Sequence, residues 1–350
     1  MNNSNTTPPP GCGGVPRGNS NYSSVSNYSS VFTREVIPVL YCLIFAAGLI
    51  LNILAAWIFF QVPSRSGLVV YLKNMVVADL LMLFSFPWRV VSDLGHGGWY
   101  LKVLVCRYTA VLYYLGMYIG IVFMGLISVE RYVKIVHASS CSPQPCSLRT
   151  SNFLQRVTVS RSLAFLSWAL MLLCMLPNSV LTNMPAAEGC SCMDLKSDLG
   201  LMWHEISAHT GVAIFWVTLV LMSFCYSSIA WQVYRSYQRV RRDSSNASRK
   251  SNQSIFSLLA VFFVCFVPYH VFRVPYTLSQ TFSISFSNKT KLHLFQAKEA
   301  TQFMASFNVC LDPLIYFLMC RTFRELLMGK VYRADNGMPS VTNRLSTSNL

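Results

Sequence analysis

The sequence predicts an all-α membrane protein, a bundle of seven transmembrane helices followed by a short amphipathic eighth helix. Two observations lead to this prediction. Of the 350 residues, 53% are hydrophobic and only 12% are charged, whereas a soluble domain is about one quarter charged. The apolar residues also gather in seven runs, each long enough to cross about 30 Å of hydrocarbon as a helix of about 20 residues. This composition excludes a disordered chain and argues against a soluble domain.

Short polar stretches separate the seven apolar runs. We expect the helices at 36–60, 68–92, 103–136, 158–182, 205–234, 254–281 and 293–319. The third and fifth runs are long and carry polar residues at both ends, so these two helices are predicted to tilt or to protrude from the bilayer.

Basic residues beside the runs predict the orientation, because positive side chains near a span are retained on the cytoplasmic side. They follow the first run, precede the fourth, fill the loop between the fifth and sixth, and follow the seventh: Arg65, Arg149, Arg156, Arg235, Arg239, Arg241, Arg242, Arg249, Lys250, Arg321, Arg324, Lys330 and Arg333. The N-terminus is therefore expected outside the plasma membrane and the C-terminus in the cytosol. The net charge of +15 reflects this topology and not a nucleic-acid surface.

Polar segments flank the bundle, which we place at 35–320. Residues 1–34 predict an extracellular tail and 331–350 a cytoplasmic tail. Between the bundle and the second tail, 321–330 carries apolar side chains on one face, as does an amphipathic helix on the inner membrane surface. The first tail contains four Asn-x-Ser/Thr acceptors for glycosylation, which are Asn2, Asn5, Asn21 and Asn27.

Ionisable and amide side chains fall at membrane depth, where they are costly unless they face the bundle interior. At 1.5 Å per residue, Asp79 lies about 16 Å into the second span, and Asn52, Asn308 and Asp312 reach comparable depths. A sodium ion held by Asp79, Asn308 and Asp312, or a proton, suits such a cluster. A polar network between helices with no ion is the alternative.

The triplet Glu130-Arg131-Tyr132 falls at the inner end of the third span, about 37 Å below Cys106. An adjacent acid and arginine can pair in one state and separate in another, which is what a conformational switch requires. By itself the triplet is weak evidence for a switch, because Glu-Arg pairs also occur by chance. The evidence becomes strong in combination with Asn52, Asp79, Trp168 with Pro177, and the run from Asp312 to Tyr316.

With these residues, nearly the whole chain resembles a rhodopsin-class G-protein-coupled receptor. More narrowly, FVCFVPYHVFRVPYTLSQT (263–281) and KEATQFMASFNVCLDPLIYF (298–317) are similar to the sixth and seventh spans of purinergic nucleotide receptors, above all those for UDP-glucose and ADP. The resemblance implies a phosphate-bearing ligand, an extracellular nucleotide or UDP-sugar, and an inhibitory heterotrimeric G protein as partner. It implies neither an enzyme nor a cofactor.

Two cations are placed to meet that phosphate. Arg273 lies about 30 Å along the sixth span, at its outer end, and Lys298 sits at the matching height in the seventh. The alternative is that both reach to lipid head groups. The resemblance carries ligand contact to eight residues, Tyr114, Asn178, His204, His270, Arg273, Tyr276, Lys298 and Glu299. It carries a role in switching to Glu130, Arg131, Tyr132, Phe266, Pro268, Asp312, Pro313 and Tyr316.

The chain also departs from its apparent relatives. Ala208 with His209 replaces an asparagine that relatives commonly have, and Gly120 replaces a serine that would supply a sodium ligand. The resemblance predicts a disulfide between Cys106 and Cys192. It leaves Cys12 either joined to Cys190 or free, because 282–297 contains no cysteine.

Three alternatives stay open at this stage. A receptor for a lysophospholipid or another anion would need a similar basic rim. A transporter would need internal repeats or broken helices, which the sequence does not display. At the start of the amphipathic helix, Cys320 is either palmitoylated or unmodified.

Overall fold

A computed structural model of the chain describes residues 32–61, 63–64, 66–139, 156–185, 191–239, 245–280 and 286–335. The predicted glycosylation sites, the cytoplasmic tail beyond 335, and the pair Cys12 and Cys190 lie outside these residues.

Seven helices of the described part are long and apolar enough to cross a membrane, which confirms the predicted bundle. Their segments in chain order are η2 (Phe32–Val36) with α1 (Ile37–Gln61), α2 (Gly67–Asp93), α3 (Gly98–Leu104) with η3 (Val105–Thr109) and α4 (Ala110–Ser139), α6 (Val157–Val180), α7 (Asp198–Arg239), α8 (Ser245–Gln280), and α9 (Asn288–Ser306) with α10 (Asn308–Met319). The eighth helix is α11 (Arg321–Asp335).

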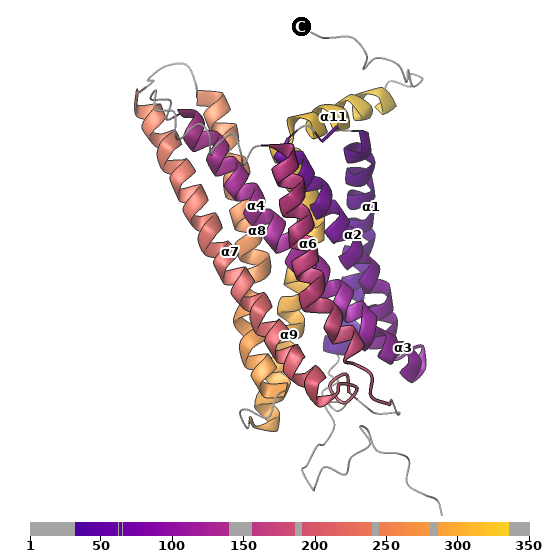
Figure 1. The fold of residues 1–350 in the computed structure, drawn as a ribbon. Coiled ribbons are helices and arrows are strands. Elements are labelled where there is room, and N and C mark those ends of the chain that lie inside the picture. Colours follow the sequence, from indigo (N-terminus) through magenta and orange to yellow (C-terminus); the bar gives the residue numbers. More distant parts are fainter. Residues whose placement is uncertain are drawn as a thin grey trace, which may run out of the picture.

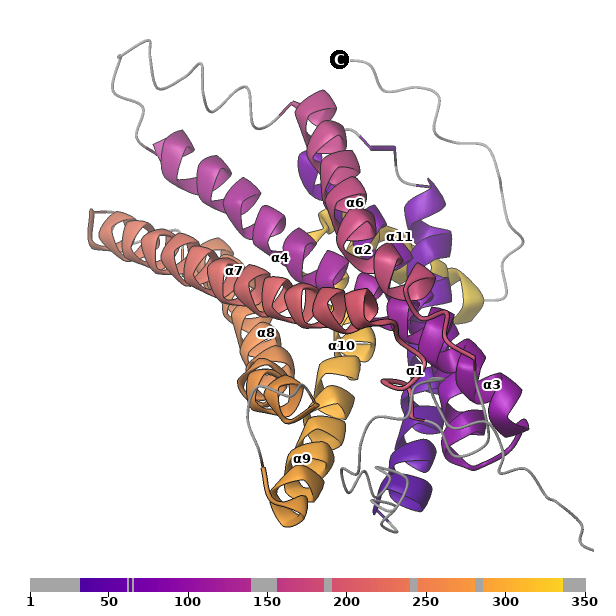
Figure 2. The same cartoon turned by 60° about the horizontal axis from the view of Figure 1, so that its bottom comes forward.

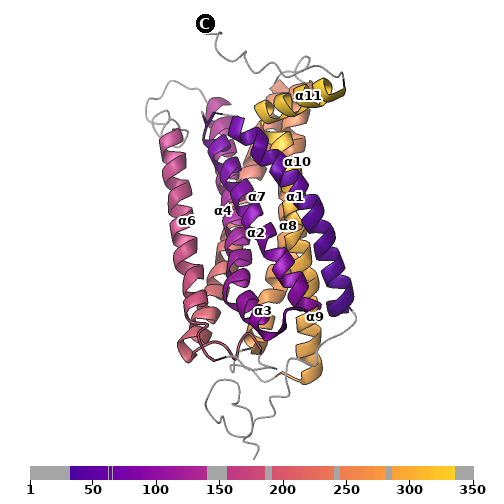
Figure 3. The same ribbon diagram turned by 90° about the vertical axis from the view of Figure 1, so that its right-hand side faces the viewer.

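Helix α4 crosses the middle of the bundle and packs against α2, α6 and α7 (Figure 1). On one side α8 lies between α7 and α9, and on the other α1 packs against α2 and α10 (Figure 2). Helix α11 turns across one end of the bundle (Figure 3). We call this the α11 end, and the opposite end, where Cys106 and Cys192 meet, the disulfide end.

Several helix boundaries differ from those predicted, because helix caps lie outside the apolar runs. Helix α7 begins seven residues before the predicted 205, at Asp198, where the Ser197 hydroxyl accepts from the Gly200 amide at 3.1 Å. In the same way Ser287 accepts from Thr290 N at 3.2 Å and starts α9. Side-chain acceptors of this kind satisfy backbone donors that the first turn leaves free.

The seventh span was predicted as one run, but it is divided. Phe307 separates α9 from α10, and its amide bonds back to the carbonyls of Phe303 and Met304 at 3.1 and 3.2 Å. The division leaves Asn308 at the start of α10, facing the bundle interior with 1% exposure.

The bundle is apolar outside and polar inside, as a bilayer requires. Phe60 and Phe165 are 89% and 75% exposed on the outer faces of α1 and α6, whereas Asn52 and Asp312 are fully buried. The polar residues placed at membrane depth by the sequence therefore do face the interior.

Two further predictions concern the ends of the bundle. The disulfide joins Cys106 in η3 to Cys192, with Cα atoms 5.4 Å apart, as predicted. At the other end, α11 continues past the predicted 330 to Asp335. Its Phe323 packs into the core, and the Cys320 thiol that precedes it is buried in the same cluster. That burial opposes modification of Cys320 in this conformation.

Candidate ligand-binding site

Arg273 on α8 points into the bundle at the disulfide end. The residue is only 4% exposed. Its guanidinium lies over the Tyr114 ring, 5.0 Å from the ring centre, and Nη1 donates to the Tyr114 hydroxyl at 3.4 Å. A side chain that reached for lipid head groups would be exposed on the outer surface, so the lipid alternative does not describe Arg273.

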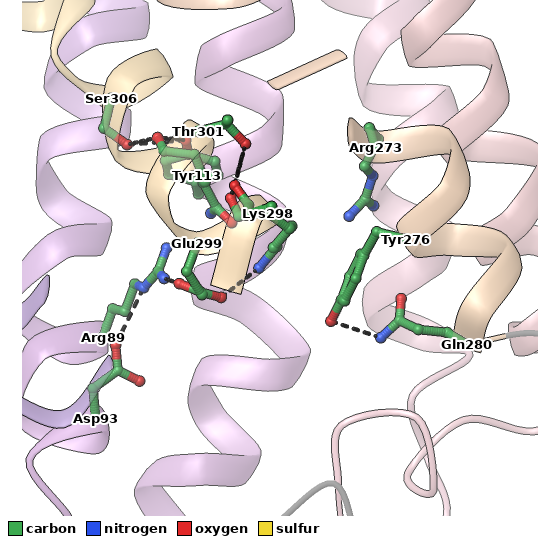
Figure 4. A network of polar contacts seen from close by, with 12 residues as sticks. Arg89, Asp93, Tyr113, Arg273, Tyr276, Gln280, Lys298, Glu299, Thr301 and Ser306 are labelled. Atoms are coloured by element: carbon green, nitrogen blue, oxygen red, sulfur yellow. Dashed lines mark hydrogen bonds and ion pairs between the residues drawn. The ribbon is translucent and has the colours of Figure 1, made fainter. Parts of the chain in front are cut away.

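Lys298 on α9 also points inward. Its ammonium lies 5.5 Å from the centre of the Tyr276 ring on α8 and 2.8 Å from the Glu299 carboxylate. Figure 4 shows Arg273 and Tyr276 on one side of this region and Lys298 with Glu299 on the other. The two cations predicted from helix length thus belong to facing helices, since α8 and α9 pack together.

Arg89 on α2 joins this cluster and was not predicted. It forms an ion pair with Glu299, a second with Asp93 at 3.3 Å, and donates to the Tyr41 hydroxyl at 3.1 Å. The signal was present in the sequence, because an arginine in an apolar span is costly without a partner. That partner lies on α9, 210 residues away.

Hydroxyl groups beneath the charged cluster tie α1, α4 and α9 together. Tyr113 bonds to Ser306 Oγ at 2.9 Å and to the Gln302 carbonyl at 3.2 Å, and Tyr41 bonds to the same Ser306 hydroxyl at 3.2 Å. These bonds join the three helices at the floor of the site.

Several buried polar atoms of the predicted set have no hydrogen-bond partner among the described residues. They include Nε of Arg273, Nε2 of His204 and of His270, and Oδ1 of Asn178. An unsatisfied buried polar group costs about 1–3 kcal/mol. A ligand that supplied donors and acceptors here would recover part of that cost.

His270 is more enclosed than the sequence indicated. Its ring stacks on Phe215 with centroids 3.9 Å apart, and Nδ1 lies 2.8 Å from the Phe266 carbonyl. Because a carbonyl only accepts, Nδ1 must carry the proton, and the neutral ring then presents Nε2 as an acceptor. His270 therefore suits a hydroxyl or amide donor of a ligand better than a phosphate, which offers only acceptors when ionised.

The other predicted contacts take different positions. Asn178 donates to Ser207 Oγ at 3.0 Å, so it fastens α6 to α7. Tyr276 accepts from Gln280 at 3.0 Å, and His204 is directed inward from α7. His209, in contrast, is exposed, whereas its neighbour Ala208 is buried.

The segment after α6 brings another cation close to the site. Lys196 donates to Thr182 Oγ1 at 3.1 Å, and Arg107 Nε donates to the Thr182 carbonyl at 2.5 Å. Burial lowers the pKa of the Lys196 amine to about 8. Thr182 Oγ1 in turn donates to the Asn178 carbonyl at 2.6 Å, which connects Lys196 to one of the predicted ligand residues.

Two hydrogen-bonded pairs of side chains make up most of the polar cluster at membrane depth. Tyr316 donates to Asp79 at 2.6 Å, and Asn308 donates to Asp312 at 3.3 Å. Asn52 instead bonds to backbone carbonyls, including that of Val309 at 2.7 Å. Among the described residues, no atom apart from the neighbouring backbone of α4 lies within 4 Å of the position that a Cβ on Gly120 would take. Asp79, Asn308 and Asp312 thus stay a candidate sodium site.

The predicted switch residues lie toward the α11 end. Arg131 Nε is 3.7 Å from the Glu130 carboxylate, and Nη2 donates to the Met319 carbonyl at 3.1 Å. Tyr132 packs on Phe224. In α8, Pro268 lies within the helix next to Phe266, whose ring packs on Phe262 and His270.

This architecture, with a closed seven-helix bundle, a buried polar cluster at one end and an acid–arginine pair at the other, defines a seven-helix membrane receptor. Residues 51–316 match the family described as 7 transmembrane receptor (rhodopsin family). The chain belongs to this family, as a multi-pass protein of the plasma membrane, and it is not an enzyme.

Curated relatives place the chain with the purinoceptors. Purinoceptor 14 of Bos taurus is 43% identical over 325 residues, 92% of this chain and 93% of that protein. G-protein coupled receptor 87 of Mus musculus is 41% identical over 307 residues, 87% and 82% of the two chains. Purinoceptor 13 of Homo sapiens is 39% identical over 298 residues, 83% and 80%.

Proposed function

We propose that this receptor is activated by an extracellular nucleotide or nucleotide sugar, most like UDP-glucose, and that it signals through an inhibitory G protein. The observation that carries the proposal is the buried Arg273 guanidinium. No ion pair joins it to a carboxylate of the described residues, and its Nε has no partner there. An unpaired buried cation is costly, and an anionic ligand would supply the missing charge.

A diphosphate fits the two facing cations. Arg273 offers a planar fork that binds two phosphate oxygens at once, and Lys298 offers a point charge on a movable stem. One face of the Tyr114 ring is covered by the Arg273 guanidinium, so a nucleobase would stack on the other face or against Tyr276. His270 and Asn178 contribute acceptors for hydroxyls or amides.

Orientation belongs to the same proposal. A disulfide forms in an oxidising compartment, so we place the disulfide end outside the cell with the ligand. The α11 end then lies in the cytosol, where α11 rests on the inner leaflet with Phe323 turned into the bundle.

Activation would link the two ends through α8. A ligand that binds Arg273 and Lys298 draws the outer parts of α8 and α9 together, and the bend at Pro268 turns this into movement of the inner part of α8. Arg131 is then released toward the G protein. To convert a 1:99 population into 99:1, the ligand must bind the active state about 5.5 kcal/mol more tightly.

The test replaces Arg273 with alanine in the full-length receptor. Cyclic AMP suppression is measured with UDP-glucose, UDP, ADP and lysophosphatidylserine at matched surface expression. We expect the active nucleotide to lose potency about 100-fold, as for a buried charged contact worth about 3 kcal/mol. His209→Ala, which removes an exposed side chain on α7, is the control and should change potency less than about threefold.

Two results would contradict the proposal. One is an unchanged concentration response of Arg273→Ala to every phosphate ligand. The other is a wild-type response confined to the lysophospholipid with a dependence on acyl-chain length.

A further inference from the structure

Charges at the site are unequally matched. The cluster contains three cations, Arg89, Arg273 and Lys298, and two carboxylates, Asp93 and Glu299. Arg89 pairs with both carboxylates and Lys298 with Glu299 alone, whereas Arg273 pairs with neither. The site therefore has two parts (Figure 4). Arg273 forms a cationic pole, and Lys298, Glu299, Arg89 and Asp93 together form a nearly neutral pole.

Glu299 is held firmly at the neutral pole. Its Oε1 accepts from Lys298 at 2.8 Å while Oε2 accepts from Arg89. The residue is 7% exposed, and a buried carboxylate that lost one of these cations would be strongly destabilised. Glu299 therefore cannot swing away to make room for an arriving anion.

Arg89 acts as the positioning residue for this carboxylate. It is fixed from the other side by Asp93 at 3.3 Å and by Tyr41, whose hydroxyl accepts at 3.1 Å and whose ring centre lies 4.6 Å from the guanidinium. Contacts on α1, α2 and α9 thus hold the negative charge beside Lys298.

A phosphate that binds Lys298 must share that ammonium with Glu299. Two anions on one ammonium lie within about 6 Å of each other, where an additional negative charge lowers affinity by about tenfold or more. A phosphate esterified on both sides carries about one charge, whereas a terminal phosphate carries nearly two because its second pKa is about 6. The Glu299 carboxylate at the neutral pole therefore lowers the affinity for a terminal phosphate more than the affinity for a phosphate esterified on both sides.

We propose that Glu299, positioned by Arg89, is a specificity-determining residue that favours a pyrophosphate esterified at both ends, as in a nucleotide sugar, over a nucleotide that ends in a free phosphate. This inference rests on the proposed nucleotide function and refines it. In this proposal Arg273 anchors the diphosphate, and the charge of Glu299 discriminates between diester and terminal phosphates.

The experiment compares UDP-glucose, with about two negative charges, and UDP, with about three. For each full-length variant, expressed at the surface of intact cells, the measured quantity is the potency of UDP divided by that of UDP-glucose. Glu299→Gln should raise this ratio about tenfold, and Glu299→Asp, which keeps the charge, should leave it within about threefold of wild type. Arg89→Gln, which leaves Glu299 to act on Lys298 alone, should lower the ratio about threefold.

Glu325→Gln is the control, because it also replaces a carboxylate with an amide, but on an exposed side chain of α11 at the opposite end of the bundle. The ratio should stay within about threefold of wild type, because an exposed charge is screened by solvent.

Opposite shifts for Glu299→Gln and Arg89→Gln, with Glu325→Gln unchanged, would establish the inference. It is overturned if Glu299→Gln leaves the ratio unchanged, or if Glu299→Asp shifts it as far as Glu299→Gln does, since shape and not charge would then decide. Failure of both UDP ligands on the wild-type receptor would instead overturn the nucleotide function itself, and the inference with it.

Discussion

Arg131 Nη2 donates to the carbonyl of Met319, the last residue of α10, at 3.1 Å. Arg131 of α4 therefore caps the C-terminus of the seventh span, where the helix dipole favours a cation. Its other contact is the weaker pair with Glu130 at 3.7 Å. This arrangement links α4 to the junction between α10 and α11.

Replacing Arg131 with methionine should loosen that junction. A hydrogen bond from a charged donor contributes about 1.5–3 kcal/mol. Amide hydrogen exchange around the turn at Cys320, whose amide bonds to the Tyr316 carbonyl, is therefore expected to become at least about tenfold faster. Lys134→Met, which changes an exposed side chain one turn further along α4, is the control. Equal exchange rates in the two variants would show that Arg131 does not hold the turn.

Serine at position 120 should confer sodium dependence. Gly120 lies one turn from Gly116, which packs against the Ala78 carbonyl next to Asp79, and space for a side chain is open there. The hydroxyl adds an oxygen ligand of the kind that hard cations prefer. We expect Gly120→Ser to gain a few degrees in Tm on exchange of choline chloride for sodium chloride, and to gain more than Gly120→Ala. A sodium response that is the same in both variants would disprove the added ligand.

Alanine at position 211 should destabilise the bundle. A Cβ on Gly211 would overlap the ring of Tyr118, which packs edge-on against His270. Overpacking of this kind costs about 1–3 kcal/mol, and a drop of several degrees in Tm is the expected result. Gly329→Ala serves as the comparison and should be neutral or slightly stabilising, because no atom of the described residues outside the local helix backbone lies within 4 Å of the new Cβ. Equal Tm values for the two variants would show that Gly211 does not need to be a glycine for packing.

Binding of UDP-glucose should weaken as pH rises through about 8. Burial lowers the pKa of Lys196 to about 8, so the amine is charged below that pH and neutral above it, while the ligand's diester phosphates keep their charge. We expect affinity to fall about threefold between about pH 7 and about pH 9. Lys196→Arg stays charged over this range and should give a flat profile. An equally steep slope in that variant would assign the titration to another group.

The lowered pKa of Lys196 also makes the free energy of unfolding depend on pH. The unfolded lysine keeps its ordinary pKa of about 10.4, so the unfolded state binds more protons than the folded state between about pH 8 and that value. Folding stability should therefore rise with pH across this window. Thermal melts of wild type and Lys196→Met should converge as the pH approaches about 10, and melts that stay parallel would contradict the assigned burial cost.

Helix number and the common level of the two key cations were predictable from the sequence, whereas their inward direction was favoured only by the family resemblance. Arg273 and Lys298 were placed at one level by counting residues along two apolar runs, because each helical residue advances by a fixed 1.5 Å. The inward orientation of Asp79 followed from the cost of a charge in hydrocarbon. The disulfide of Cys106 with Cys192 was anticipated only through the family resemblance.

The partners of these groups were not predictable. Arg89 and Glu299 are 210 residues apart, and Asp79 and Tyr316 are 237 apart, and nothing local in either segment specifies the other. His270 was expected to contact the ligand, but the proton position was not predictable, because stacking on Phe215 and the bond to Phe266 O place the proton on Nδ1. The division of the seventh span at Phe307 also left no mark in the apolar pattern.

The amino-acid sequence alone determined how many times this chain crosses the bilayer and which side chains must turn away from lipid, because hydrocarbon thickness and the cost of unpaired charge act on each segment separately. Tertiary packing decided which charges neutralise one another. The balance of Arg89, Glu299 and Lys298 exists only where α2 and α9 come together, and it leaves Arg273 without a carboxylate. The reason is that Coulomb energies depend on distances across the bundle, and these are set only when all seven helices pack.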